Sequence, residues 1–328
     1  MSDWQAGTDL DMLQMRARML SDIRAFFAER DVLEVETPVL SRYATTDLHL
    51  DSMQCHVGER RYFLNTSPEY AMKRLLAQHK APIYQVSRVF RDDEIGQYHN
   101  PEFSLLEWYR PGFDDVMLMA EVEALVRCLY LPDDARQAVA VQRISYRDAF
   151  VQVLGVDPHE ITAHECHELA IERDIDIPQG MTVSQSDRDA WLDWFLTQVV
   201  MPSVSAAHVF TFLCDYPVSQ AALAAIAPDQ TGRMVAKRFE LFFGELELAN
   251  GFFELTDADE QRRRFEQDNR LRQAAGKQAM PVDEYLLDAL AHGMPSSAGV
   301  ALGLDRLLMV LSDSESIDKV IGFTINKA

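Results

Sequence analysis

The sequence has few cysteines and no long apolar run. Its 328 residues include four cysteines (Cys55, Cys128, Cys166 and Cys214), and none of them forms a Cys-x-x-Cys pair. This wide spacing argues against a disulfide-stabilised secreted protein. Neither a signal peptide nor an apolar stretch of membrane-spanning length is evident. The pattern is typical of a reduced, cytoplasmic protein that does not associate with membranes.

Positive charge is also scarce, because 31 basic residues stand against 52 acidic ones and leave a net charge of −21 at pH 7. An acidic surface repels polyanions, so an extended contact with tRNA or DNA would require a local basic patch. The five arginines within residues 261–273 alternate with acidic residues at helical spacing. This favours a salt-bridged helix face over a nucleic-acid contact.

The most informative stretch predicts an antiparallel hairpin. Residues 84–90 and 103–109 are alternating runs rich in β-branched and aromatic residues, and a polar loop separates them. Because side chains alternate across a strand, Phe103, Glu107 and Tyr109 are expected on one surface. An aromatic plate, a carboxylate and a phenol on one face would bind something flat and something cationic.

The loop of this hairpin carries groups suited to a nucleotide. Arg91 follows the first strand, and Glu94 and His99 lie in the loop. A guanidinium can pair with phosphate oxygens, while a carboxylate and an imidazole can recognise the edge of a base.

The run FRDDEIGQYHNPEF, residues 90–103, resembles motif 2 of the class II aminoacyl-tRNA synthetases, and in detail that of their lysyl branch. The resemblance implies that Arg91 contacts the α-phosphate of ATP, that Glu94 contacts the adenine and that Phe103 stacks on it. The other nucleotide and substrate contacts that it implies come from Asp93, His99 and Asn100.

Residues 10–41 resemble motif 1 of the same superfamily, which builds a dimer interface. Apolar residues recur at helical spacing to about Glu29 behind a candidate cap at Thr8 or Asp9, and the strand-like run VLEVETPVLS follows. Arg30 and Asp31 stand where the family usually has a glycine. The resemblance implies a homodimer, although any amphipathic helix before an edge strand would give this pattern.

Residues 62–76, YFLNTSPEYAMKRLL, predict a strand, a turn and a helix that begins near Ser67. The Thr-Ser-Pro-Glu segment resembles that of the lysyl branch, in which the glutamate meets the substrate amino group. This implies that Ser67 and Glu69 bind substrate. Ser-Pro-Glu is also favourable chemistry for a helix start, so plain capping is the alternative interpretation.

The segment Glu-Leu-Ala-Asn-Gly at 247–251 matches the lysyl branch without a gap. The resemblance implies that Glu247 holds Mg²⁺ on the ATP phosphates, that Leu248 contacts the nucleotide and that Asn250 helps to bind substrate. It implies that Glu254 receives the distant amine of the substrate, and Glu254 is also a candidate magnesium ligand. Carboxylate oxygens suit Mg²⁺, and a desolvated ammonium needs a carboxylate partner. Two acidic edge strands are the alternative.

Residues 295–311, PSSAGVALGLDRLLMVL, predict a strand, a glycine and a helix, and they resemble motif 3. This implies that Gly303 and Arg306 bind ATP. Ala301 stands where lysyl-tRNA synthetases typically have glycine. An added methyl group on the wall of the amino-acid pocket is expected to crowd an α-amino group.

Residues 111–210 are less informative and predict several helices, with a helical insertion at about 133–205. The cluster HECHE at 164–168 has His164 and His167 three residues apart, whereas zinc on a helix favours histidines at i and i+4. A solvated helix face is therefore the better interpretation.

Together these motifs predict one class II synthetase-like catalytic domain over residues 1–328, an α+β fold with an antiparallel sheet flanked by helices. The implied reaction is ATP-dependent, AMP-forming activation of a carboxylate, with Arg91 and Arg306 as catalytic residues and ATP and Mg²⁺ as cofactors. Glu69, Glu107, Tyr109 and Glu254 are expected to select a diamino acid.

The expected acceptor is a protein. Lysyl-tRNA synthetases carry an anticodon-binding domain before motif 1, and only a few residues precede the first helix here, so tRNA is a poor candidate. The chain resembles the stand-alone lysyl-synthetase paralogues that ligate (R)-β-lysine to a lysine of elongation factor P, and Ala301 suits a substrate with its amino group one carbon further out. The alternatives are a truncated synthetase that charges tRNA with α-lysine or makes a free amide, and a catalytically silent paralogue acting as a sensor.

Overall fold

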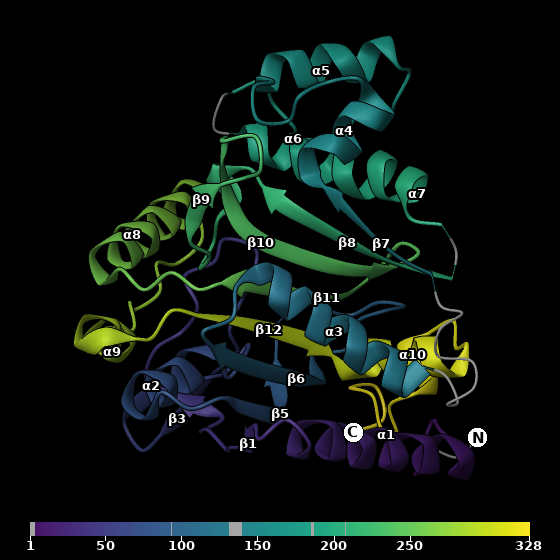
Figure 1. The fold of residues 1–328 in the computed structure, drawn as a ribbon, viewed down its shortest axis with the longest axis vertical. Helices are drawn as coiled ribbons and strands as arrows, with labels where there is room; N and C mark the ends of the chain where they lie inside the picture. Colours follow the sequence, from purple (N-terminus) through teal and green to yellow (C-terminus); the bar gives the residue numbers. More distant parts are fainter. Residues whose placement is uncertain (1–3, 93, 131–139, 185–186, 207) are drawn as a thin grey trace. The chain divides into compact units, whose positions relative to one another are not determined.

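A computed structural model describes residues 4–92, 94–130, 140–184, 187–206 and 208–328 (Figure 1). The chain forms two compact units. Both ends of the chain build the first unit, Met1–Gln137 with Phe253–Ala328, and the middle of the chain builds the second, Ala138–Phe252. The second unit therefore includes the described part of the predicted insertion together with the strands that follow it.

The first unit contains helices on a largely antiparallel sheet. Its helices are α1 (Leu10–Ala28), α2 (Glu69–His79), α3 (Asp115–Tyr130), α8 (Ala258–Ala274), α9 (Glu284–Gly293), α10 (Leu304–Ser312) and the 3₁₀ turn η5 (Ile317–Lys319). Its strands are β1 (Leu33–Glu34), β2 (Leu40–Ser41), β3 (Gln54–Val57), β4 (Arg60–Leu64), β5 (Ile83–Phe90), β6 (Glu102–Pro111) and β12 (Ser297–Gly303). A separate small sheet has the order β2-β4-β3.

The predicted hairpin is the centre of the first unit, where strands follow the order β1-β5-β6-β12 (Figure 1). β5 and β6 pair antiparallel with Tyr84 opposite Trp108, and β12 pairs antiparallel with β6. Phe27 of α1 stacks on Tyr84 at 4.4 Å and meets Trp108 edge-on at 5.4 Å. These aromatic rings bury the back of the hairpin and fix α1 against it.

Helix α1 begins where the sequence predicts, because the Asp9 carboxylate accepts a hydrogen bond from the Met12 N–H at 2.9 Å. Of the strand predicted over residues 32–41, only the two short strands β1 and β2 form. The N–H of Leu33 bonds Pro82 and that of Val35 bonds Tyr84, so this segment pairs along one side only. The pairing with β5 ends before Pro38, because proline has no N–H to donate.

Helix α8 carries the arginines that the sequence assigned to a salt-bridged face. Arg262 pairs with Glu284 at 2.6 Å and Arg264 with Glu260 at 2.9 Å. Arg272 is buried and donates to the Asp51 carboxylate and to the backbone carbonyls of Asp47 and Leu50. The pairs of Arg262 and Arg264 confirm the salt-bridge interpretation for these two arginines, whereas the buried Arg272 instead holds the loop of residues 47–51.

Within the second unit, the strands follow the order β11-β10-β8-β7, and β9 pairs with β10. Its strands are β7 (Ala140–Ser145), β8 (Val209–Tyr216), β9 (Ile226–Pro228), β10 (Met234–Phe243) and β11 (Leu246–Phe253). Its helices are α4 (Tyr146–Leu154), α5 (Ala163–Glu172), α6 (Arg188–Phe195), the π-helical turn η3 (Leu196–Val200), α7 (Met201–Val204) and the 3₁₀ turn η4 (Val218–Gln220). With helices on sheets in both units, the predicted α+β class is confirmed.

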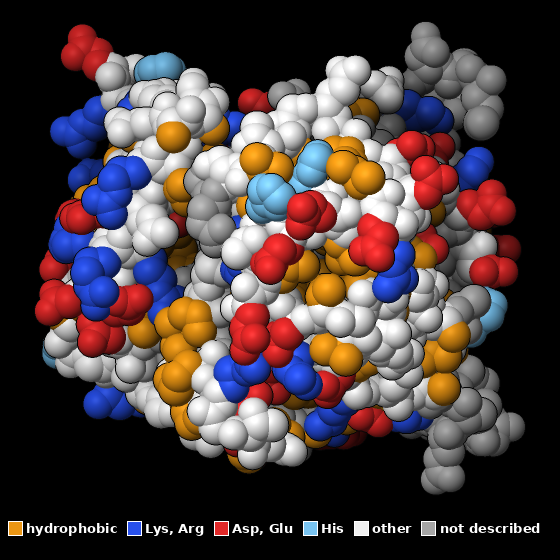
Figure 2. All heavy atoms as spheres, turned by 90° about the horizontal axis from the view of Figure 1, so that it is seen from above, with side chains coloured by type: hydrophobic (Ala, Val, Ile, Leu, Met, Phe, Trp, Pro, Cys, Tyr) orange, Lys and Arg blue, Asp and Glu red, His pale blue; other side chains and the backbone are white. Residues whose placement is uncertain are grey.

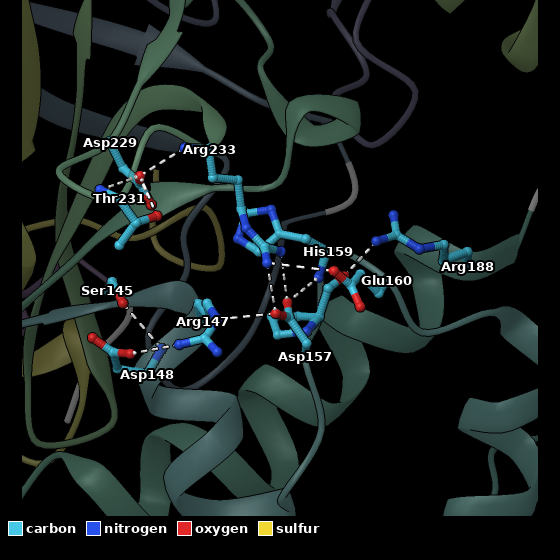
Figure 3. Close-up of polar contacts among 11 residues, drawn as sticks. Ser145, Arg147, Asp148, Asp157, His159, Glu160, Arg188, Asp229, Thr231 and Arg233 are labelled. Atoms are coloured by element: carbon cyan, nitrogen blue, oxygen red, sulfur yellow. Dashed lines mark hydrogen bonds and ion pairs between the residues drawn. The ribbon is translucent and has the colours of Figure 1, made fainter.

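The second unit is held by an aromatic core and an ionic cluster. Trp191 and Phe195 are buried in this core. In Figure 3, Arg147 and Arg233 converge on Asp157, at 2.9 and 3.1 Å. Burial alone would raise the pKa of Asp157, but the His159 N–H and the two guanidinium groups hold it below its ordinary value. This cluster joins α4 to the loop before α5 and to the turn before β10.

The surface shows mixed charge. On the face drawn in Figure 2, Lys and Arg side chains lie among Asp and Glu side chains. On helix α5 the His164 ring lies 3.5 Å from the exposed Glu168 carboxylate, as expected for a solvated face. None of the helices in the described ranges is both long enough and apolar enough to cross a membrane.

Gly251 provides a test of the packing in the second unit. It lies opposite Phe239 in the β10–β11 register, and an added Cβ would lie 2.3 Å from the Phe239 ring. We expect Gly251→Ala to destabilise the protein by about 1–3 kcal/mol, because the ring cannot move without disturbing the core. Urea unfolding followed by fluorescence measures the loss. Gly322→Ala is the control, since its Cβ would meet only Thr8 at 3.8 Å, and equal stability of the two variants would contradict the prediction.

Candidate active site

Strand β6 presents a buried carboxylate and a phenol on one face, as its alternation predicts. The Tyr109 hydroxyl donates to Glu107 Oε1 at 2.6 Å, and the Ser67 hydroxyl donates to Glu107 Oε2 at 2.7 Å. Ser67 also accepts the Glu69 N–H at 3.0 Å, so the capping chemistry and the contact with Glu107 occur together. Both carboxylate oxygens of Glu107 are thereby fixed, and only 1% of the residue is exposed.

A buried lysine joins two further carboxylates beside Glu107. The Lys73 ammonium lies 2.7 Å from Glu69 Oε1 and 2.6 Å from Glu254 Oε2. Lys73 and Glu254 are each only 2% exposed. Burial disfavours the charge of Lys73, but Glu254 and Glu69 together raise its pKa well above the ordinary value. Lys73 is therefore charged, and its pairing with Glu254 favours the predicted amine contact of that carboxylate over the predicted magnesium contact.

The acidic groups of this cluster are hard to ionise. Burial, followed by the charge of Glu69, raises the pKa of Glu107 to about 8. Burial also raises the pKa of Glu254 to about 7, with Lys73 opposing the shift and Glu69 adding to it. Glu254 Oε1 is buried and accepts no hydrogen bond from the residues that the structure describes. A buried acceptor of this kind is a place for an incoming ammonium group.

Strand β12 forms one wall of the cluster. Ala301 lies directly opposite Glu107 and Gly299 directly opposite Tyr109 in the β6–β12 register, and opposite residues in an antiparallel pair share a face. A Cβ on Gly299 would lie 2.3 Å from the Tyr109 ring and 2.5 Å from Glu254 Oε1. Gly299 is therefore restricted to glycine, and the Ala301 methyl group is the side chain that β12 adds beside Glu107.

Residues of motifs 2 and 3 form a second cluster in the first unit. The Arg91 guanidinium lies 5.0 Å from the centre of the Phe103 ring and 3.6 Å from Glu94. Arg91 Nε is buried and has no hydrogen-bond acceptor among the described residues. Arg306, in the first turn of α10, lies 2.7 Å from the His99 ring. An aromatic face beside a half-buried guanidinium and a helix N-terminus fits a nucleotide.

The loop between β5 and β6 is braced by the C-terminal segment. The N–H of Ile317 bonds the Gln97 carbonyl at 2.8 Å, and the N–H of Ile325 bonds Asn100 Oδ1 at 3.0 Å. The Asn100 amide also donates to the Glu102 carbonyl at 2.6 Å. Asn100 thus holds the loop through backbone contacts that the sequence did not indicate, while Asp93 lies outside the described residues.

The second unit holds the remaining predicted residues, Glu247, Leu248 and Asn250, on β11 beside β10. Glu240 pairs with Arg238, which also donates to Asn250 Oδ1 at 3.3 Å. Burial raises the pKa of Glu240 to about 7, Arg238 opposes the shift and Glu247 adds to it. Leu248 is buried and Glu247 is half-buried. In the described part of the chain, no three His, Cys, Asp or Glu side chains converge to hold a metal ion. A carboxylate such as that of Glu247 fits Mg²⁺ when phosphates and water complete the coordination shell of the ion.

Sequence reasoning missed Lys73, Arg238 and Glu240. A signal for Lys73 existed, because it stands four residues after Glu69 and between Met72 and Leu76 on the buried face of α2. A lysine on an apolar helix face needs a buried partner. Arg238 and Glu240 alternate on one strand, but nothing in the sequence shows that they pair.

Comparison with known proteins gives two concordant results. The family described as "tRNA synthetases class II (D, K and N)" matches residues 3–327. A curated protein of Edwardsiella ictaluri named elongation factor P–(R)-beta-lysine ligase is 44% identical over 334 residues, covering 100% of this chain and 99% of that protein. The protein of the same name from Salmonella typhi is 43% identical over 331 residues, covering 99% and 98%.

The raised pKa of Glu107 predicts a pH-dependent stability. Between the ordinary glutamate pKa and about 8, the folded state holds a proton that the unfolded state has released. Glu107 therefore makes the ligand-free protein less stable as pH rises through this range. We expect Glu107→Gln to raise the Tm at pH 8 by a few degrees, since about 1 kcal/mol shifts Tm by ~2–4 °C in a domain of roughly 200 residues.

The same difference in Tm should shrink towards pH 5, where the wild-type carboxyl is protonated in the folded state. Differential scanning calorimetry at both pH values measures it. Glu102→Gln, at an exposed position on the same strand, is the matched control. A Glu107→Gln protein that melts below wild type at pH 8 would contradict the prediction.

Proposed function

This chain belongs to the class II tRNA synthetases (D, K and N), and from that premise we propose that it activates (R)-β-lysine with ATP and ligates it to a lysine side chain of elongation factor P. The reaction is ATP-dependent and AMP-forming. Its first half makes an aminoacyl-adenylate, and its second half makes an amide bond with the acceptor protein.

The net charge of the buried cluster supports a diamino acid as the substrate. Glu69, Glu107 and Glu254 are three carboxylates, and Lys73 is the ammonium that contacts two of them. When all four groups are ionised, two negative charges are in excess. The two ammonium groups of a diamino acid compensate them, whereas a monoamine leaves a buried carboxylate unpaired. We propose that Glu69 receives the amine near the substrate carboxylate and Glu254 the distant one, with Ser67 and Tyr109 completing the site.

The motif 2 and motif 3 residues support the activation step. The substrate carboxylate attacks the α-phosphorus of ATP, the bond to the bridging oxygen breaks, and pyrophosphate leaves. Arg91 and Arg306 are proposed to stabilise the developing negative charge, while Phe103 stacks on the adenine and Glu94 and His99 position the nucleotide. The buried Arg91 Nε–H, which donates to no acceptor among the described residues, supports this role. No protein nucleophile is required.

Glu247 is the side chain that we propose for Mg²⁺. It is half-buried, and its charge adds to the rise in the pKa of Glu240 that burial causes; a hard carboxylate oxygen of this kind suits a divalent ion. When bound, the ion would neutralise charge on the ATP phosphates. Glu254 and Glu240 are not proposed as magnesium ligands, because the Lys73 ammonium already contacts Glu254 and the Arg238 guanidinium already contacts Glu240.

The proposed acceptor is a protein amine. The ε-amine of the acceptor lysine attacks the acyl carbonyl of the adenylate, loses a proton and displaces AMP. A net charge of −21 opposes an extended contact with tRNA, which also favours a protein acceptor.

We also propose a cytoplasmic homodimer. Leu10 and Leu13 of α1 and Leu40 of β2 are exposed, and a two-fold contact through this predicted motif 1 segment would cover them. The four cysteines are free thiols, which suits a reducing compartment.

The proposal predicts ATP–pyrophosphate exchange in the absence of tRNA. We expect exchange to be fastest with (R)-β-lysine and slower with its enantiomer and with α-lysine, because the cluster selects by the positions of two amines. Faster exchange with α-lysine would favour a minimal tRNA-type synthetase. A complete absence of exchange with all three would favour the catalytically silent alternative. Transfer to purified elongation factor P, detected as a mass increase, tests the second half-reaction.

The Ala301 methyl group predicts a change of specificity. Because it adds bulk opposite Glu107, we expect Ala301→Gly to raise the kcat/KM ratio of α-lysine to β-lysine by about 10-fold, the order expected for one methyl group in a pocket. Exchange kinetics with both amino acids measure the ratio. Gly322→Ala, a methyl change at a position distant in the sequence, serves as control, and an unchanged ratio for Ala301→Gly would rule out the crowding explanation.

A further inference from the structure

Lys73 is the one member of the buried cluster to which the proposed reaction assigns no task. Its ammonium contacts neither a phosphate-binding residue nor the solvent, and both of its ion pairs go to carboxylates that are proposed to bind substrate amines. A buried lysine that serves packing alone would be replaced at little cost by an apolar residue. The position of Lys73 between two recognition groups calls for a different explanation.

Burial makes the ionised state of the cluster difficult to maintain. Burial and the charge of Glu69 raise the pKa of both Glu107 and Glu254, and Lys73 opposes the rise at both. Without the ammonium, the pKa of these two carboxyl groups would rise further. A protonated carboxyl no longer attracts an ammonium ion, so a cluster without Lys73 would bind a diamino acid weakly.

The contacts of Lys73 also fix where its partners lie. Lys73 and Glu69 are four residues apart on α2, so their side chains meet on one helix face. Glu254 belongs to a distant part of the chain, and its N–H bonds the Ser297 carbonyl at the start of β12. Lys73 thereby links the first turn of α2 to the segment beside β12. The carboxylate of Glu254 is held with one oxygen on Lys73 and the other directed towards Gly299 and Tyr109.

We infer that Lys73 is a positioning and specificity-determining residue of the amino-acid site, an internal ammonium that pairs with Glu69 and Glu254 and aligns both carboxylates so that the site accepts a substrate with two further amines. Lys73 acts through these carboxylates and does not contact the reacting atoms. The inference rests on the proposed activation of a diamino acid and adds the residue that sets the charge of its site.

The first experiment compares Lys73→Met with wild type in pyrophosphate exchange. We expect the KM for the diamino acid at pH 7 to rise on the order of tenfold or more, and the KM for ATP to stay within about twofold, because the nucleotide residues are separate from this cluster. In the variant, kcat/KM for the diamino acid should climb further between pH 7 and pH 9 than in wild type, since its carboxyl groups ionise at higher pH. The matched control is Lys80→Ala, because Lys80 is an exposed lysine that directly follows helix α2.

The second experiment uses chemical rescue. Lys73→Ala removes the atoms that propylammonium contains, so added propylammonium should lower the KM for the diamino acid towards the wild-type value. The bulkier tert-butylammonium should not, and neither ion should affect Lys80→Ala. If Lys73→Ala does not fold, the neutral pair Lys73→Met with Glu254→Gln replaces it, and this variant should keep wild-type ATP affinity while losing the preference for diamino acids over monoamines.

Several results would overturn the inference. These are a Lys73→Met protein with unchanged KM for the diamino acid, parallel losses for amino acid and ATP, and a failure of propylammonium to rescue a folded Lys73→Ala protein. Wild-type exchange decides the proposed function separately. Absence of exchange in wild type refutes activation itself, whereas wild-type exchange that Lys73 variants leave unaltered refutes only the role of Lys73.

Discussion

The burial of Glu107, Glu254 and Lys73 beside the half-buried Glu69 is the constraint on which the first unit depends. Carboxylates out of water are costly unless cations and hydrogen-bond donors compensate them. Lys73, Ser67 and Tyr109 provide that compensation in part. The raised pKa values of Glu107 and Glu254 show that it is incomplete without a ligand. A site of this kind is less stable when empty, and a ligand with two positive charges relieves that instability on binding.

The surrounding elements hold this cluster in place. β12 lies close to β6 because Gly299 has no side chain to collide with Tyr109. Asp305, at the start of α10, is buried, accepts the Ser104 N–H at 2.6 Å and pairs with Arg16 of α1. These contacts connect motifs 1, 2 and 3 through one carboxylate. The position of Arg306, which follows Asp305, depends on the same connection.

The nucleotide residues are distributed between elements with different supports. The loop that carries Arg91 and His99 is braced by the C-terminal segment through Gln97 and Asn100. Glu247 lies on β11 of the second unit, whose packing depends on Gly251 and Phe239. Structural residues far apart in the sequence therefore hold the proposed nucleotide residues in place. Each of these structural residues can be substituted without removing a catalytic group.

The sequence alone determined the elements and most of the motif residues. Alternation predicted β5, β6 and the shared face of Glu107 and Tyr109, because strand geometry is local. It did not predict the shortening of the strand at residues 32–41, because pairing depends on a partner. Only the tertiary structure showed that Lys73 lies between Glu69 and Glu254, that Asn100 holds the C-terminal segment, and that Arg238 pairs with Glu240. Ion pairs between distant residues and the pKa shifts caused by burial have no local pattern, since they arise when the chain folds and removes these groups from water.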